Sequence, residues 1–572
     1  MRRMASLLWK PGWLADRTAV HRKLALFFSL LAAGVVAVAL TDCGGGGGGS
    51  PSVASSTPAG TSSPQPAPTS STHTDVATYR DDAGRTGADA TESVLTPANV
   101  NSSSFGLLRV LPVDGKVDAQ PLYLSQLSIG GTTHDVVFVA TENDSVYAFD
   151  PQTGATLWHA SLLQSGEAPS DDRGCDQITP EIGVTSTPVI DRSAGPHGAL
   201  YVVAMSKDGS ANYYQRLHAL DVTTGAELFN GPVTVNPTYS SAAGGQETFS
   251  AGQYAERAAL LLQNGTVYTS WTSHCDSEPY SGWVVGYSES TLAQSAVLNI
   301  AADSDGGPSI WMSGGGLAAD TTGNIYLLTA NGGFETTLNS GGFPQNGDYG
   351  NSFLKLSTAG GGLAVADYFT PFNEVAESAA DEDLGSGGVL LLPDQTDSGG
   401  TVRHLMVGGG KDGIVYVINR DDMGKFSSSA NADWQELDGV LPGGIFSTPA
   451  YFNGTVYYAA TGGPLEAFPV TGAKLSSQPT SQTSTEFPYP GASPAVSASG
   501  TSDGIVWAVE NHDPAVLHAY DASDLTHELY NSTQASGGRD NFGSGNKFIT
   551  PTVADGMVFV GTTNGVAVFG LR

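Results

Sequence analysis

The sequence is poor in cysteine and in positive charge. Its 572 residues include three cysteines, and Lys and Arg total 24 against 56 Asp and Glu, which gives a formal net charge of −32. No run of Lys or Arg occurs after the first 43 residues. Such an acidic body repels phosphate groups, which argues against nucleic acids and anionic lipid surfaces as its partners.

Several chemical signatures are also missing. The sequence has no His-Glu-x-x-His, no Walker motif and no Cys-x-x-Cys-His for covalent haem. Charged residues make up only 14% of the chain, while 73 glycines accompany abundant Val, Thr, Tyr and Phe. That composition is typical of short strands joined by tight turns, so we expect an all-β protein with few helices.

The N-terminus has the pattern of an export signal. Residues 1–23 carry six Lys or Arg and residues 24–40 are uncharged, as in the n-region and h-region of a signal peptide. The following Leu40-Thr41-Asp42-Cys43 resembles the lipobox of bacterial lipoproteins, in which the cysteine is acylated; Asp42 departs from the small neutral residue favoured there. A lipoprotein acylated at Cys43, an uncleaved membrane anchor and ordinary secretion all stay open for residues 1–43.

Residues 44–74 form a Gly/Ser/Pro/Thr-rich linker that lacks the apolar side chains needed for a core. We therefore predict a disordered tether, with residues 75–572 as one folded body held at the cell envelope, in the periplasm or at the outer surface. Contact with the membrane is expected only through the N-terminal lipid or anchor.

The body repeats one unit: a Thr/Ser-Pro strand start, an apolar pair, an alternating strand with Val/Leu-Tyr, a Gly/Asn/Asp turn and an Ala-x-Asp strand. Alternation of period two predicts half-buried strands, and the Asn/Asp/Gly pairs predict hairpin turns. Five clear copies span 136–150, 187–221, 448–468, 493–521 and 550–569, and three weaker ones span 255–299, 313–370 and 386–420. Eight copies in series predict a closed repeat architecture.

One copy continues as Ala-x-Asp-x-x-Thr-Gly-x-x-x-Trp from Ala148 to Trp158, which resembles the pyrroloquinoline-quinone (PQQ) repeat. Further segments such as 408–413 and 420–424 resemble exported bacterial proteins that carry PQQ-like repeats. The resemblance implies an eight-bladed β-propeller. Its last copy ends at Phe569 without an outer strand, and we predict that Phe105–Val113 supplies it, so that strands from both chain ends close the ring.

Quinoprotein alcohol dehydrogenases share this propeller, and the resemblance implies a site with PQQ and Ca²⁺. Counterparts of its parts are Asn331 and Glu181 as Ca²⁺ ligands, Asp381 within 381–385 as the base, Lys411 as the quinone contact and Trp311 as the floor under the ring. The vicinal cysteine pair of that family has no counterpart. Each residue also has a plainer interpretation as a turn, an acidic loop or blade packing.

Cys175 and Cys275 stand in similar settings, Arg-Gly-Cys-Asp-Gln and Ser-His-Cys-Asp-Ser. In an oxidising compartment we predict a disulfide, worth roughly 3–5 kcal/mol by the loop-entropy model. A metal site with His274 and Asp276, or two free thiols, are the alternatives. Asp303–Gly307 is either a Ca²⁺ loop or a plain turn.

Two classes of function remain. The first is an envelope-tethered binding or scaffolding propeller whose ligand or protein partner docks on one face, where the insertions 333–349 and 471–489 are expected to lie. A role like that of the outer-membrane assembly propeller lipoprotein is one version of it. The alternative is a PQQ/Ca²⁺-dependent alcohol or sugar dehydrogenase.

Overall fold

The computed structural model describes residues 75–277, 279–303 and 306–572. Three predicted features lie outside these residues: the signal or anchor at 1–43 with its Cys43, the linker at 44–74, and Ser304 and Asp305 of the possible Ca²⁺ loop. Within the described residues no helix is long and apolar enough to cross a membrane. The single α-helix there, α1 (Glu374–Ala379), is short.

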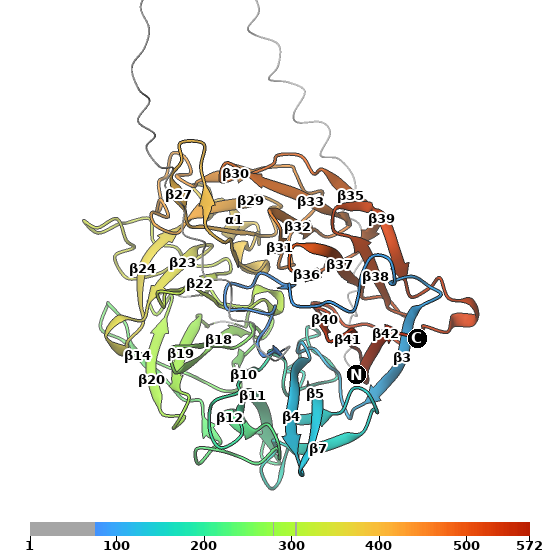
Figure 1. The fold of residues 1–572 in the computed structure, drawn as a ribbon. Coiled ribbons are helices and arrows are strands. Elements are labelled where there is room, and N and C mark those ends of the chain that lie inside the picture. Colours follow the sequence, from blue (N-terminus) through green and yellow to red (C-terminus); the bar gives the residue numbers. More distant parts are fainter. Residues whose placement is uncertain (1–74, 278, 304–305) are drawn as a thin grey trace, which may run out of the picture. The chain divides into compact units, whose positions relative to one another are not determined.

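Eight sheets of four to six strands surround a central axis, as Figure 1 shows, and this confirms the predicted eight-bladed β-propeller. Blade 1 consists of β1 (Asp75–Val76), β4 (Leu122–Ile129), β5 (Thr132–Thr141), β6 (Ser145–Phe149) and β7 (Thr156–Ser161), and blade 2 consists of β8 (Glu167–Asp171), β9 (Glu181–Ile182), β10 (Val189–Asp191), β11 (Ala199–Asp208), β12 (Tyr213–Asp221) and β13 (Val233–Thr234). Blade 3 consists of β16 (Tyr254–Ala255), β17 (Leu261–Gln263), β18 (Thr266–Ser273), β19 (Trp283–Ser288) and β20 (Gln294–Asn299), and blade 4 consists of β21 (Ala318–Ala319), β22 (Ile325–Leu328), β23 (Phe353–Ser357) and β24 (Ala364–Phe369).

Blade 5 consists of β25 (Leu390–Leu391), β28 (Leu405–Gly409), β29 (Val415–Asn419) and β30 (Gln435–Leu437), and blade 6 consists of β31 (Ala450–Phe452), β32 (Thr455–Ala459), β33 (Gly463–Thr471), β34 (Lys474–Leu475) and β35 (Ser481–Phe487). Blade 7 consists of β2 (Ala88–Asp89), β36 (Ala495–Ser499), β37 (Ser502–Glu510), β38 (Val516–Asp521) and β39 (Asp524–Asn531), and blade 8 consists of β3 (Phe105–Pro112), β40 (Thr552–Ala554), β41 (Met557–Gly561) and β42 (Gly565–Leu571). Two small hairpins, β14 (Thr238–Ser240) with β15 (Gln246–Thr248) and β26 (Gln395–Thr396) with β27 (Val402–Arg403), lie outside the blades. Strands β34 and β35 lie within 471–489, so that stretch adds strands to blade 6 and is not one free loop.

Blade 8 joins the two ends of the folded body. Strand β3 pairs antiparallel with β42, with Phe105 opposite Leu571 and Leu107 opposite Phe569. The rings of Phe105 and Phe569 stack at 6.3 Å between centroids. The predicted closure by Phe105–Val113 is thus confirmed, and it covers the edge of β42 that would otherwise be free.

The core is divided among the contacts between neighbouring blades, because both faces of each sheet are buried. On β5, Phe138 and Ala140 pack toward blade 2, whereas Val137 and Val139 pack toward blade 8. Trp158 on β7 shows how the repeat docks blades: its indole Nε1 donates to the carbonyl of Val222 at 2.9 Å. A Cβ added at Gly225, in the Thr-Gly turn of blade 2, would lie 2.6 Å from the Trp158 ring, so the turn requires glycine there.

Residues 75–90, here called the plug, fill the central channel. Their carbonyls accept hydrogen bonds from successive blades: Ala77 from Ile190, Ala83 from Ala319, Gly84 from Leu391, Thr86 from Tyr451 and Gly87 from Val496, at 2.7–2.9 Å. Arg80 and Arg85 are fully buried, and they donate to carbonyls of blades 6 and 7 and of blades 3 and 4 respectively. Figure 1 shows this segment crossing the centre of the ring, so the channel is not open through the propeller.

One catalytic sequence motif occurs within the blades without the structure that its chemistry requires. Residues 500–504 read Gly-x-Ser-x-Gly, the sequence of a nucleophile elbow. They form the exposed hairpin between β36 and β37, whereas that elbow is a strand-to-helix turn.

Candidate functional site

A cavity of about 310 Å³ lies at one end of the plugged channel. Its walls come from two kinds of segment: the loops that lead into the innermost strand of a blade, and the turns between the second and third strands. The residues that line it are Asp172, Cys175, Gln177, Ile178, Ile182, Ala255, Arg257, Thr272, Ser273, His274, Cys275, Asp276, Ser309, Trp311, Ala330, Asp383, Lys411, Phe446, Tyr489 and Phe548. Blades 2 to 8 therefore all contribute to one site.

Four of these side chains, here called the aromatic quartet, form a closed circuit. The ring centroids of Trp311 and Phe446 lie 6.1 Å apart, those of Phe446 and Tyr489 5.2 Å, those of Tyr489 and Phe548 6.3 Å, and those of Phe548 and Trp311 6.3 Å. Most of these pairs meet edge to face, a favourable arrangement for aromatic rings. The quartet presents a wall suited to a flat apolar or aromatic group.

The resemblance to quinoprotein dehydrogenases implied Trp311 but not its three companions. Phe446 and Phe548 each stand two residues before a Thr-Pro strand start, at Thr448 and Thr550. That repeated spacing was the available signal, because the residues before the innermost strands converge on the axis of a propeller. Tyr489 stands four residues before its Ser-Pro start at Ser493, so it does not share this spacing.

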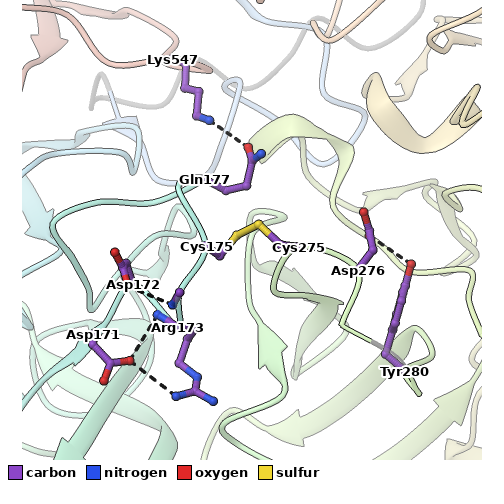
Figure 2. The surroundings of a disulfide bond; sticks show 10 residues. Asp171, Asp172, Arg173, Cys175, Gln177, Cys275, Asp276, Tyr280 and Lys547 are labelled. Atoms are coloured by element: carbon purple, nitrogen blue, oxygen red, sulfur yellow. Dashed lines mark hydrogen bonds and ion pairs between the residues drawn. A yellow bond between two sulfur atoms is a disulfide. The ribbon is translucent and has the colours of Figure 1, made fainter. Parts of the chain in front are cut away.

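A disulfide forms another part of the wall. Cys175 and Cys275 are bonded with their Cα atoms 5.7 Å apart, across 100 residues of sequence. Figure 2 shows that the bond ties the loop before β9 to the turn after β18, which joins blades 2 and 3. The alternative metal site is not formed: His274 Nε2 lies 3.1 Å from the carbonyl of Tyr254, and Asp276 accepts from the Tyr280 hydroxyl. Burial lowers the pKa of His274 to about 4, so it is neutral.

On the wall nearest blade 5, the half-buried Lys411 and the buried Asp383 form an ion pair, with Nζ and Oδ2 2.6 Å apart. The backbone N–H of Asn331 donates to Asp383 Oδ1 at 2.7 Å. Burial raises the pKa of Asp383, although Lys411 opposes the rise. Burial acts to lower the pKa of Lys411, but the carboxylates of Asp383 and Asp381 outweigh it and raise the pKa.

Asp381, predicted from the sequence as the base, lies outside the cavity wall. Its side chain is 75% exposed, and it accepts from Lys411 at 2.9 Å and from the amide of Asn331 at 3.1 Å. Asp383, two residues later and 5% exposed, is the carboxylate that faces the cavity. The segment with the predicted base does reach the site, but through a different residue.

These side chains do not fit a Ca²⁺ ion of the kind that the quinoprotein resemblance implies. Both oxygens of Asp383 already accept hydrogen bonds, and Asn331 is not among the residues that line the cavity. Glu181 does not line the cavity, although its neighbour Ile182 does. Throughout the part of the chain that the structure describes, no cluster of three His, Cys, Asp or Glu could hold a metal. A flat ring fits better, because the rings of the aromatic quartet line the same space.

Comparison with known proteins supports the fold. Residues 113–302 match a protein-family model described as outer membrane protein assembly factor BamB. The quinohemoprotein alcohol dehydrogenases of Comamonas testosteroni and Pseudomonas putida HK5 superpose with TM-scores of 0.56 and 0.55, each at 14% identity over 87% of this chain and 80% of the other. A europium-containing methanol dehydrogenase gives 0.54 at 14% identity, over 87% and 98%. No curated protein matches the sequence.

At 14% identity these structural matches define the fold and leave the activity open. The class of protein is a β-propeller built from PQQ-like repeats. The described residues of this chain also have a plugged channel, an aromatic quartet and a disulfide that joins two blades.

Proposed function

We propose that the protein is an envelope-tethered binding propeller whose central cavity holds a small, flat, ring-containing organic molecule. The observation that carries the proposal is the aromatic quartet, which encloses one side of a cavity of about 310 Å³. Cavities of this size, with mostly apolar walls and a few convergent polar groups, are the usual form of small-molecule sites.

Two further features support a bound small molecule over a threaded chain. The plug fills the channel, so a ligand enters and leaves by the same end. The disulfide fixes the loops of blades 2 and 3 relative to each other, which preserves the shape of the wall before a ligand arrives. Tethering is proposed from the signal, lipobox and linker pattern of residues 1–74 alone.

A PQQ-dependent dehydrogenase is the second candidate, favoured by the position of Asp383 beside Lys411 on the cavity wall. PQQ, when bound, supplies a two-electron acceptor for alcohol oxidation. In that case Asp383 would take the hydroxyl proton of the substrate, and Lys411 would stabilise the resulting negative charge near the ring. The poor fit to Ca²⁺ places this candidate second.

One experiment separates the two functions. The purified body is dialysed against PQQ with Ca²⁺ or with a chelator, bound PQQ is measured by absorbance, and dye-linked oxidation is assayed over a panel of alcohols and sugars. The binding function predicts bound PQQ in both conditions and no turnover. Turnover that is lost in the Asp383→Asn variant would establish the dehydrogenase instead, and the absence of binding in both conditions would remove PQQ-like rings as ligands.

A further inference from the structure

Arg257 is the one arginine on the cavity wall, and its guanidinium has an unusual environment. The residue is 7% exposed, and it precedes the innermost strand of blade 3. Its Nη1 is buried without a hydrogen bond. The nearest carboxylate oxygen, Asp118 Oδ2, is 3.6 Å away and is also held by Lys116 at 3.1 Å.

The two buried arginines of the plug, unlike Nη1 of Arg257, donate hydrogen bonds to backbone carbonyls. Arg80 donates to the carbonyls of Pro494 and Pro449 at 2.7 and 2.5 Å, and Arg85 donates to Leu317 at 2.8 Å and Leu260 at 3.1 Å. A guanidinium has five N–H donors, and burying it without acceptors is costly. Arg257 therefore has N–H groups that can donate hydrogen bonds to a ligand in the cavity.

The surroundings of Arg257 hold it in place for a ligand. Its guanidinium lies over the ring of Phe548, 5.0 Å from the centroid, so it borders the aromatic quartet. Lys547 adds a second cation nearby, with its Nζ donating to Gln177 at 2.9 Å (Figure 2). Burial, and then the charge of Arg257, lower the pKa of Lys547 to about 8. Two cations thus meet beside one aromatic wall.

We propose that Arg257 binds a carboxylate on the ring-containing ligand, while the ring itself lies against the aromatic quartet. The planar guanidinium matches a carboxylate in a two-hydrogen-bond fork, and such bonds are among the strongest in proteins. The ligand class is then an aromatic carboxylic acid. This inference rests on the proposed binding function and narrows it.

The test compares two probes of equal shape, quinoline-2-carboxylate and quinoline-2-carboxamide, by calorimetric titration of the whole folded body. In the wild type the acid is expected to bind at least about tenfold more tightly than the amide, because a charge-assisted pair replaces a neutral contact. Arg257→Gln should abolish that preference by weakening the acid alone. Arg173→Gln, which removes an arginine beside the same disulfide but off the cavity wall, should leave it unchanged.

The outcomes are distinct. Equal affinity for acid and amide in the wild type would overturn the carboxylate inference while leaving the binding function intact. An acid preference that survives in Arg257→Gln would overturn the assignment to Arg257. Failure of both probes to bind would overturn the binding function and this inference with it. If Arg257→Gln does not fold, the wild-type comparison still decides whether the ligand class is acidic.

Discussion

Among single residues, Glu142 at the turn after β5 is a carboxyl group kept neutral by its surroundings. It is fully buried, and its Oε2 accepts from the backbone N–H of Gly183 at 2.8 Å and from the Thr185 hydroxyl at 3.0 Å. Burial, together with the nearby charge of Asp118, raises the pKa of Glu142 to about 8. The positive charge of Lys116 opposes the rise without cancelling it. Protonated Glu142 is therefore the form present at pH 7.

This raised pKa predicts a pH-dependent stability. In the unfolded chain the carboxyl has its ordinary pKa of 4.5, so its contribution to folding is complete below that pH and is lost as the pH rises through about 8. Glu142→Gln mimics the neutral form, and its melting temperature should fall less than that of the wild type between pH 5 and 8.5. The control Glu486→Gln removes an exposed carboxylate instead. Equal pH profiles for wild type and Glu142→Gln would contradict the account.

The two aspartates of 381–385 show the limit of prediction at the residue scale. The segment was recognisable, but which carboxylate faces the cavity depends on the backbone path between them. Asp381 has φ +60, in the left-handed region, just after the end of α1, whereas Asp383 stands at the start of the short turn η3 (Leu384–Ser386). The sequence motif therefore located the segment, but the path of its backbone determines which of the two aspartates lines the cavity.

At the scale of elements, the blades were predictable and the plug was not. Each blade is built from strands close in sequence, so its alternation of apolar residues is visible locally. The blade carbonyls that accept hydrogen bonds from Arg80 and Arg85 lie 175 to 414 residues away in four different blades, so no local sequence pattern predicts them. The closing pair β3 and β42 is equally distant, but the missing outer strand of the last copy revealed it.

The plug also yields a matched pair of substitutions. A Cβ at Gly87 would collide with the guanidinium of Arg80, whereas one at Gly130 would meet nothing within 4 Å; both glycines have positive φ, +67 and +60. Gly87→Ala should therefore lower the free energy of unfolding by about 2 kcal/mol or more beyond the effect of Gly130→Ala, since it disturbs a buried hydrogen-bonded charge. Denaturant titration measures both. Equal losses would show that the plug is loosely packed around Arg80.

At the scale of the whole molecule, an acidic body contains a cavity whose wall carries both signs of charge, because Arg257 and Lys411 line it together with Asp172, Asp276 and Asp383. The chain carries a net charge of −32, yet a further cation, Lys547, adjoins the cavity. The fold could be predicted because repetition, closure and resemblance all agreed. The composition of the cavity could not, since its residues come from seven blades and converge only when the ring closes.

Attachment of the whole protein to the cell envelope is also a prediction from the sequence. If Cys43 is acylated, Cys43→Ala should move the protein from the membrane to the soluble fraction, because the acyl chains provide the membrane affinity. Cell fractionation with immunodetection measures the change. Retention of the variant in the membrane would instead indicate that residues 24–40 form an uncleaved anchor.

The central claim is that the aromatic quartet holds a flat ring, and one calorimetric comparison tests it most directly. The dissociation constant of PQQ is measured for the wild type, for Phe446→Ala and for Phe372→Ala, which removes a phenylalanine that is 47% exposed and off the cavity wall. We predict saturable binding that weakens about tenfold or more in Phe446→Ala and is unchanged in Phe372→Ala, because only the first loses a ring contact. Binding of equal strength in all three proteins, or no saturable binding in the wild type, would contradict the claim.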